Sequence, residues 1–337
     1  MIWIRLSVIA AFLMALPPQT PTQPGIRFGH SLAYDSHGRR VVLVDGYTWV
    51  RAVSPIEPPE RTDLWAWNGN EWSRLAGTGP ASRTMNRAVY DIGRRTLVSF
   101  GGRVGRPDTP HSDTWQWSSG SWQRIADAAD GPNVHFEMAY DAARATTVRY
   151  GGAIRLAAGG FAWPTTTWGW DGRTWTRLAT DGPVGRAASH MVFDGRRREI
   201  VLFGGQGAAH GAGQPQPVFG DTWLWNGRAW RQASVVGPPP RSFHAMTFDS
   251  GAGLVLLHGG MNGDRILDDL WGWDGTRWRE MTQGASSPGK RRLHAIVFDE
   301  ARNRTVLYGG VGPDASGATG GYDDTWEWNG RGWSRIR

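Results

Sequence analysis

The chain has 337 residues, a hydrophobic fraction of 40%, a charged fraction of 20% and a formal net charge of +7, which are typical of a soluble globular protein. It contains no cysteine, which excludes disulfide bonds and thiol chemistry. Lys290 is the only lysine, so arginine carries the positive charge. We interpret this charge as a compositional bias and expect no nucleic-acid partner.

The N-terminal segment is typical of an export signal. A single positive charge, Arg5, precedes the apolar run Leu6–Leu16, which is short for a membrane span. We therefore assign residues 1–16 to a signal peptide, or to an N-terminal anchor if they stay uncleaved. Residues 17–26 are rich in Pro, Thr and Gln and predict an unfolded linker. We expect a secreted or periplasmic protein with no membrane span in the mature chain.

A second region, from residue 27 onward, repeats a tryptophan-rich motif six times at intervals of 48 to 55 residues. Its clearest copy, Asp268–Glu280, predicts two short strands joined by Asp274-Gly275, a preferred type I′ turn. The two tryptophans before the turn are two residues apart and therefore point to one face. Since 18 of the 21 tryptophans occupy matched positions in these hairpins, we expect them to form the core between repeats.

Each repeat begins with another pair of predicted strands. The first ends in an aromatic residue and an aspartate, as in His244–Asp249, and the second is apolar and ends in a glycine pair, as in Leu254–Gly260. Repeat 1 has Asp45-Gly46 instead of the pair. Four strands per repeat, without a helical pattern between them, predict an all-β fold, a six-bladed β-propeller of four-stranded antiparallel blades. The blades are expected at about residues 27–76, 83–126, 133–179, 186–233, 241–282 and 291–337.

The glycine pair after the second strand, the Asp-(Thr/Leu)-Trp at the start of the third and the Trp that opens the fourth resemble the kelch-repeat family of β-propellers, here a bacterial exported member. This resemblance covers about residues 27–337 and implies that the first strand of each blade is innermost. It also implies that the links between second and third strands share one face with the links between blades, and that the tight turns lie opposite. No strand is left over to close the ring by swapping. Copper-radical oxidases of this architecture need a Tyr–Cys crosslink, which this chain cannot form.

Loop length varies mainly in the links between second and third strands. The interval from the glycine pair to the next tryptophan ranges from 11 to 19 residues. Loops on a rigid scaffold often carry binding sites, although neutral drift of loop length would give the same pattern. The long loops 47–62, 153–165 and 206–220 contain the aromatic residues that we expect to contact a ligand, namely Trp49, Trp163 and Phe219, with Phe161 beside them.

An arginine stands eight residues before the aspartate of the aromatic-Asp pair in five repeats. Near the channel mouth, a ring of guanidinium groups could bind carboxylates or sulfates. Five aspartates that begin third strands lie on the same implied face and could pair with the ring instead, so both interpretations stay open. The arginines are Arg27, Arg83, Arg186, Arg241 and Arg291, with Asn133 in repeat 3, and the aspartates are Asp63, Asp113, Asp221, Asp269 and Asp324.

Two other sets of residues recur. His30, His244 and His294 occupy one position of the repeat, but no carboxylate recurs with them, so we expect them to pack in the core and predict no metal and no cofactor. The turns of the opposite face are rich in arginine, as at Arg94-Arg95 and Arg196–Arg198. These arginines could meet an acidic polysaccharide or could simply be solvated.

No short catalytic motif is matched, and no catalytic residue is assigned. We therefore predict a monomeric, non-catalytic binding scaffold that engages a glycan or a protein through its variable loops. The alternative is a carbohydrate-active enzyme resembling the kelch-type sialic acid epimerases, acting on an acidic sugar. An arginine and a titratable group that converge in the channel mouth would favour the enzyme, whereas arginine–aspartate pairs there would favour the scaffold.

Overall fold

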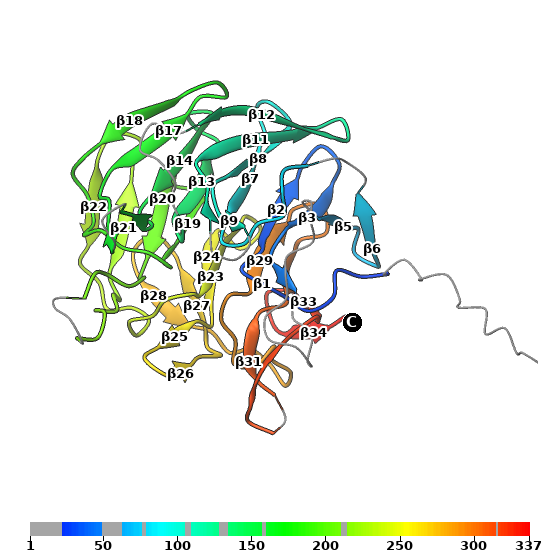
Figure 1. The fold of residues 1–337 in the computed structure, drawn as a ribbon. Coiled ribbons are helices and arrows are strands. Elements are labelled where there is room, and N and C mark those ends of the chain that lie inside the picture. Colours follow the sequence, from blue (N-terminus) through cyan, green and yellow to red (C-terminus); the bar gives the residue numbers. More distant parts are fainter. Residues whose placement is uncertain are drawn as a thin grey trace, which may run out of the picture.

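Six four-stranded antiparallel sheets form a ring, which confirms the expected six-bladed β-propeller (Figure 1). The computed structural model describes residues 22–48, 63–75, 79–104, 109–127, 134–156, 160–209, 214–314 and 316–337. Trp49, Asn133 and the expected signal peptide lie outside these residues. Within them there is no helix with the length and hydropathy that crossing a bilayer requires.

The four strands of each blade follow one another in sequence order, as the repeat predicts. Blade by blade they are β2 (Ser31–Asp35), β3 (Arg40–Val44), β5 (Leu64–Trp67) and β6 (Trp72–Leu75); β7 (Arg87–Asp91), β8 (Thr96–Phe100), β11 (Asp113–Ser118) and β12 (Ser121–Asp127); β13 (Glu137–Asp141), β14 (Thr146–Tyr150), β17 (Thr167–Trp170) and β18 (Trp175–Ala179); β19 (His190–Asp194), β20 (Glu199–Phe203), β21 (Thr222–Trp225) and β22 (Trp230–Ala233); β23 (Ala245–Asp249), β24 (Leu254–His258), β27 (Leu270–Trp273) and β28 (Trp278–Glu280); β29 (Ala295–Asp299), β30 (Arg304–Tyr308), β33 (Thr325–Trp328) and β34 (Trp333–Arg335).

Among the described residues, no strand is exchanged between blades to close the ring. The first strand of every blade contacts the first strands of both neighbours, and β2 contacts β29, so these strands are innermost. The segment before β2 completes the seam, because the amide of Gly310 in blade 6 donates to the carbonyl of Arg27 over 2.7 Å. The equivalent bond from Gly205 to Arg241 joins blades 4 and 5 over 2.8 Å. Closure thus repeats the hydrogen bond that joins other neighbouring blades.

The tryptophans build the core between blades. Trp67, the second of its hairpin, is fully buried, and its ring centroid lies 5.4 Å from that of Trp72 across the turn. Both pack on Val306 and Tyr308 in the second strand of the preceding blade. Each buried indole removes about 200 Å² of mostly apolar surface from water, which is a main source of blade–blade adhesion.

A hydrogen bond between blades accounts for the threonine of the Asp-Thr-Trp motif. The indole N–H of Trp278 in blade 5 donates to Oγ1 of Thr222 in blade 4 over 2.9 Å. Where the motif reads Asp-Leu-Trp, as at Leu270, the next blade's Trp333 N–H is buried without a partner among the described residues. The choice of Thr or Leu in one blade therefore decides whether the indole of the next blade is satisfied.

Replacing Thr222 with valine is expected to lower the free energy of unfolding by about 1–3 kcal/mol, because the buried indole N–H of Trp278 loses its acceptor. Thr305→Val is the matched control: Thr305 is fully buried, but its hydroxyl has no hydrogen-bond partner among the described residues. That change should be neutral or stabilising. Urea titrations of the two variants measure the difference, and equal losses would show that the Trp278–Thr222 bond contributes nothing.

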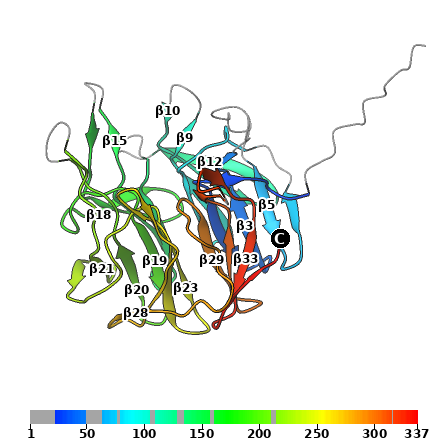
Figure 2. The same ribbon diagram turned by 90° about the horizontal axis from the view of Figure 1, so that it is seen from below.

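In blades 2, 3, 5 and 6 the link between the second and third strands contains a small hairpin on one face. These hairpins pair β9 (Arg103–Val104) with β10 (Thr109–Pro110), β15 (Ile154–Arg155) with β16 (Phe161–Ala162), β25 (Met261–Asn262) with β26 (Arg265–Ile266), and β31 (Val311–Pro313) with β32 (Thr319–Gly321). In blade 1 the link contributes β4 (Tyr47–Thr48), which pairs with β1 (Arg27–Phe28), a short strand that precedes the first strand of the blade. Figure 2 shows β10 and β15 projecting from one edge of the ring. We call this the loop face, and the opposite one, which carries the tight turns, the turn face.

Candidate functional site

Each of the five predicted arginines is buried at the base of a loop and pairs with the aspartate that begins the third strand of its own blade. Arg241 donates from Nη1 and Nη2 to the two carboxylate oxygens of Asp269 over 2.6 and 2.7 Å. Its Nη1 and Nε also donate to the carbonyls of Gly259 and Pro239, both over 3.0 Å. The corresponding pairs are Arg27–Asp63, Arg83–Asp113, Arg186–Asp221 and Arg291–Asp324.

The electrostatics of these pairs favour the pairing interpretation. Burial alone would raise the pKa of Asp113, but the hydrogen bonds and charge of Arg83 outweigh it and lower the pKa to about 2. Burial would likewise raise the pKa values of Asp221 and Asp269, but Arg186 and Arg241 lower them below their usual range. The carboxyl groups of Asp113, Asp221 and Asp269 therefore stay ionised at neutral pH. The guanidinium groups of the ring direct most of their donors to aspartates and carbonyls, although Nε of Arg83 has no partner among the described residues.

The aromatic residues expected to contact a ligand differ in exposure, since Phe219 and Trp163 are partly buried and Phe161 is exposed. The Phe219 ring centroid lies 4.3 Å from the guanidinium carbon of Arg186, so this residue packs on an ion pair. Trp163 is half-buried, and Trp49 lies outside the described residues. On the hairpin of blade 3, by contrast, Phe161 is 54% exposed and Leu156 is 45% exposed. Leu156 could not be identified from the sequence, because an aliphatic residue in a loop carries no distinctive signal.

Arginines of the turn face connect neighbouring blades through hydrogen bonds. Arg197 donates from Nη1 to Asp194 in its own turn over 2.7 Å and to the carbonyl of Gly253 in the next blade over 3.2 Å. Arg144 repeats this arrangement with Asp141 and the carbonyl of Arg198. These side chains stabilise the ring. Arg39, Arg95, Arg196 and Arg198 are exposed, so the turn face keeps positive charge in contact with solvent.

The recurrent histidines are packed among aromatic rings. The His30 ring lies edge-on to Tyr308, with centroids 5.8 Å apart, and His244 lies in the same way against Phe203 at 5.6 Å. Burial, with a smaller effect of Arg27, lowers the pKa of His30 to about 3. No group of three or more potential metal ligands occurs among the described residues.

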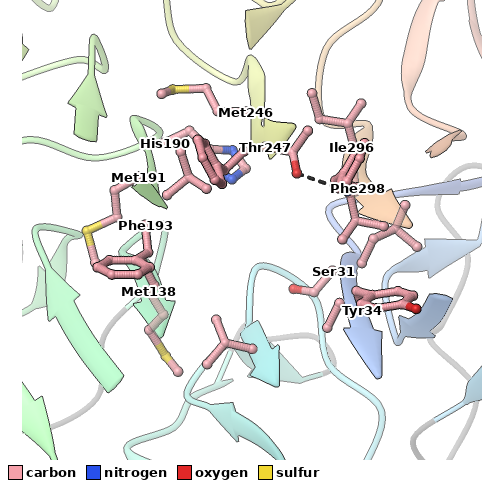
Figure 3. A pocket seen from close by; sticks show the side chains of 18 of the residues that line it. Ser31, Tyr34, Met138, His190, Met191, Phe193, Met246, Thr247, Ile296 and Phe298 are labelled. Carbon is pink, nitrogen blue, oxygen red and sulfur yellow. Dashed lines mark hydrogen bonds between the residues drawn. The ribbon is translucent and has the colours of Figure 1, made fainter. Parts of the chain in front are cut away.

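A central cavity of 690 Å³ runs between the six inner strands. Figure 3 shows its wall, in which Met138, Met191, Phe193, Met246 and Phe298 surround an open centre. At the turn face the lining residues are exposed, so the cavity opens there; these are Ile92, Ala142, Gly195, Arg196, Ser250, Gly251 and Glu300. The sequence gives no sign of this cavity, because the apolar residues that line it have the pattern of ordinary strand residues.

At the loop face the cavity is narrowed by a ring of strained backbone. In each blade the residue two positions before the first strand has a positive φ, between 54° and 63°, and all six of these residues line the cavity: Gly29, Met85, His135, Ala188, Phe243 and Leu293. Hydrogen bonds between them include Phe243 N to Ala188 O over 2.8 Å and Leu293 N to Phe243 O over 3.0 Å. The His135 and Phe243 rings lie 5.8 Å apart although their blades are not adjacent. Left-handed backbone is unfavourable for side-chain-bearing residues, so these bonds hold it in place.

An ion pair lies within the cavity wall. Arg87 on β7 donates from Nε and Nη2 to the two oxygens of Glu137 on β13, over 2.9 and 2.7 Å. Burial raises the pKa of Glu137 to about 7, although Arg87 acts in the opposite direction. In addition to burial, the charge of Arg87 lowers the pKa values of His135 and His190, which belong to blades 3 and 4. The charge of its guanidinium group therefore affects the pKa values of residues across the channel.

The comparisons with known proteins show the fold alone. A solved structure described as "Structure of YjhT" superposes with a TM-score of 0.67, covering 94% of this chain and 99% of its own, at 14% sequence identity. No protein-family model and no curated protein matches the chain. The kelch-repeat resemblance thus stays a prediction from the sequence motifs, while the β-propeller architecture is shared with a solved structure.

Proposed function

We propose that this protein is an exported, non-catalytic binding scaffold that engages a glycan or a protein through the hairpins of its loop face. The observation that supports this most directly is the set of buried arginine–aspartate pairs at the loop bases. In these pairs the aspartates engage the guanidinium groups that an acidic substrate would need. The pairs also anchor loops of unequal length on a rigid ring. The apolar run of residues 1–16 supports export to the periplasm or the exterior.

The hairpin of blade 3 is the best candidate contact surface. Its Leu156 and Phe161 are exposed apolar side chains on a short ladder, in which Leu156 N donates to Gly160 O over 3.1 Å. Aromatic side chains presented on ordered loops supply much of the affinity in many binding surfaces, whether the partner is a sugar ring or a protein.

In a glycan-array experiment, the wild-type protein is expected to bind a defined subset of glycans, and Leu156→Ser/Phe161→Ser to lose at least about tenfold in affinity, as for a central apolar contact. Ile125→Ser is the matched control, because Ile125 is 37% exposed on the outer strand β12. Unchanged binding by the double variant would exclude this hairpin as the contact. An array that stays silent would exclude a glycan ligand and leave a protein partner.

A second candidate, an enzyme acting on an acidic sugar, is favoured by one observation. Arg87 and a titratable acid, Glu137, meet in the cavity wall, close to His190. Two hydroxyl groups of the lining are already engaged, since Ser31 donates to the carbonyl of Asn86 and Thr247 accepts from the amide of Phe298. The ring nitrogens of His30 and His244, by contrast, belong to the lining and have no hydrogen-bond partner among the described residues. Turnover of an acidic sugar that is abolished by Glu137→Gln would support the enzyme.

A further inference from the structure

The central cavity combines a largely apolar wall with the guanidinium group of Arg87. Methionine and phenylalanine side chains form a large part of the wall, including Met138, Met191, Phe193 and Met246 (Figure 3), and five histidines belong to the lining as well. A volume of 690 Å³ lies within the range of sites that enclose small molecules. Methionine adapts its shape to an apolar guest and makes favourable contacts between sulfur and aromatic rings. The methionine and phenylalanine side chains of the wall are therefore suited to packing against an apolar body.

The guanidinium group of Arg87 has one nitrogen that Glu137 does not engage. Arg87 uses Nε and Nη2 for Glu137, and its Nη1 makes no hydrogen bond with the described residues. The side chain lines the cavity and keeps 22% of its surface exposed, whereas the Glu137 side chain keeps 1%. Arginine and carboxylate form strong charge-assisted hydrogen bonds, and a desolvated cavity strengthens them. Nη1 of Arg87 is thus available to donate a hydrogen bond to an anion inside the cavity.

The opening of the cavity is separate from the loops of the proposed function. Arg196 and Glu300 stand exposed at its rim on the turn face, and the loop-face end is narrowed by the ring that contains His135 and Phe243. A guest therefore reaches Arg87 from the turn face, whose exposed arginines attract anions.

We propose that the cavity binds a small monocarboxylate with an apolar aliphatic or aromatic body. The carboxylate accepts hydrogen bonds from Nη1 of Arg87, and the body packs on the methionine and phenylalanine wall. Glu137 keeps the guanidinium oriented through its two hydrogen bonds. The neutral primary amide of the same acid has the same shape but no charge, so it should bind more weakly.

Isothermal titration calorimetry tests this directly, with hexanoate to dodecanoate and 4-phenylbutyrate as probes, each paired with its primary amide. At least one carboxylate is expected to bind about tenfold or more tightly than its amide, as for a charge-assisted hydrogen bond. Failure of every probe to bind at millimolar concentration would overturn the proposal, as would equal affinity of acids and amides.

Two variants locate the site. Arg87→Met/Glu137→Met removes both charges together, which avoids an unpaired buried ion, and should bind acid and amide equally. Ala142→Trp places a large ring at the exposed rim and should weaken both probes at least tenfold, whether or not the double variant folds. Full binding by Ala142→Trp would refute access from the turn face, and a preserved preference for acids in the double variant would refute the role of Arg87. Neither result bears on the loop face, where Leu156→Ser/Phe161→Ser should bind these probes normally.

Discussion

Replacing Arg241 with methionine is expected to lower the free energy of unfolding by about 3–5 kcal/mol. The change leaves the carboxylate of Asp269 with no cation to balance it, and it removes the donors that hold the carbonyls of Gly259 and Pro239. Arg241 is fully buried, so water cannot replace these bonds without opening the blade. Chemical denaturation with urea measures the loss.

The matched control is Arg231→Met, because the Arg231–Glu199 pair spans 2.9 Å but the arginine side chain is 56% exposed. That change should cost less than about 1 kcal/mol. Arg241→Met/Asp269→Asn should recover part of the stability, since an amide oxygen still accepts from the indole of Trp271. If Arg241→Met weakened glycan binding while leaving stability intact, the ring would be a ligand site and the pairing interpretation would be wrong.

Lowering the pH from 7 to 5 is expected to destabilise the fold through its buried histidines. Burial lowers the pKa values of His30 and His258 to about 3 and those of His244 and His294 well below the ordinary value of 6.5. Below pH 6.5 these histidines therefore take up protons in the unfolded chain, whereas in the folded chain they stay neutral. The free energy of unfolding falls across this window, by about 2 kcal/mol per histidine at pH 5.

Two buried acids change the free energy of unfolding in the opposite direction as the pH falls. Burial raises the pKa values of Asp45 and Glu137 to about 7, so the folded chain takes up these protons as the pH falls from 7, while the unfolded chain does so only near pH 4. They stabilise the fold in acid, but they are fewer than the histidines, so a net loss is expected.

His30→Phe isolates one histidine, because phenylalanine keeps the ring that packs on Tyr308 and cannot titrate. The loss of stability between pH 7 and pH 5 should shrink by about 2 kcal/mol. His37→Phe, in an exposed turn, should leave the loss unchanged. Denaturation curves of the three proteins at both pH values give the comparison, and an identical loss in wild type and His30→Phe would remove the histidine explanation.

The two proposed sites use opposite faces of one ring, and the structure explains how this is possible. The hairpins of the loop face rest on the arginine–aspartate pairs, whereas the cavity opens among the tight turns. The ring of hydrogen bonds through Ala188, Phe243 and Leu293 lies between them. A ligand on the loops and a guest in the cavity can therefore be tested independently.

Local sequence determined the blades and their number. The alternation of residues, the Asn-Gly and Asp-Gly turns and the matched tryptophans specify each hairpin without long-range information, because strand period and turn type depend on neighbouring residues. A sheet with two apolar faces must pack against its neighbours, so six copies of the Trp67–Trp72 type imply a closed ring. The same pattern placed arginines such as Arg241 and aspartates such as Asp269 at one end of each blade.

Only the tertiary structure decided what these residues do. Whether Arg241 meets Asp269 or a ligand depends on the distance between segments 28 residues apart, which spacing alone does not specify. The cavity and its Arg87–Glu137 pair arise because inner strands of neighbouring blades converge, and the left-handed positions at Met85 and Phe243 have no residue type in common. Contacts between blades are set by the closure of the whole ring, so no single repeat encodes them.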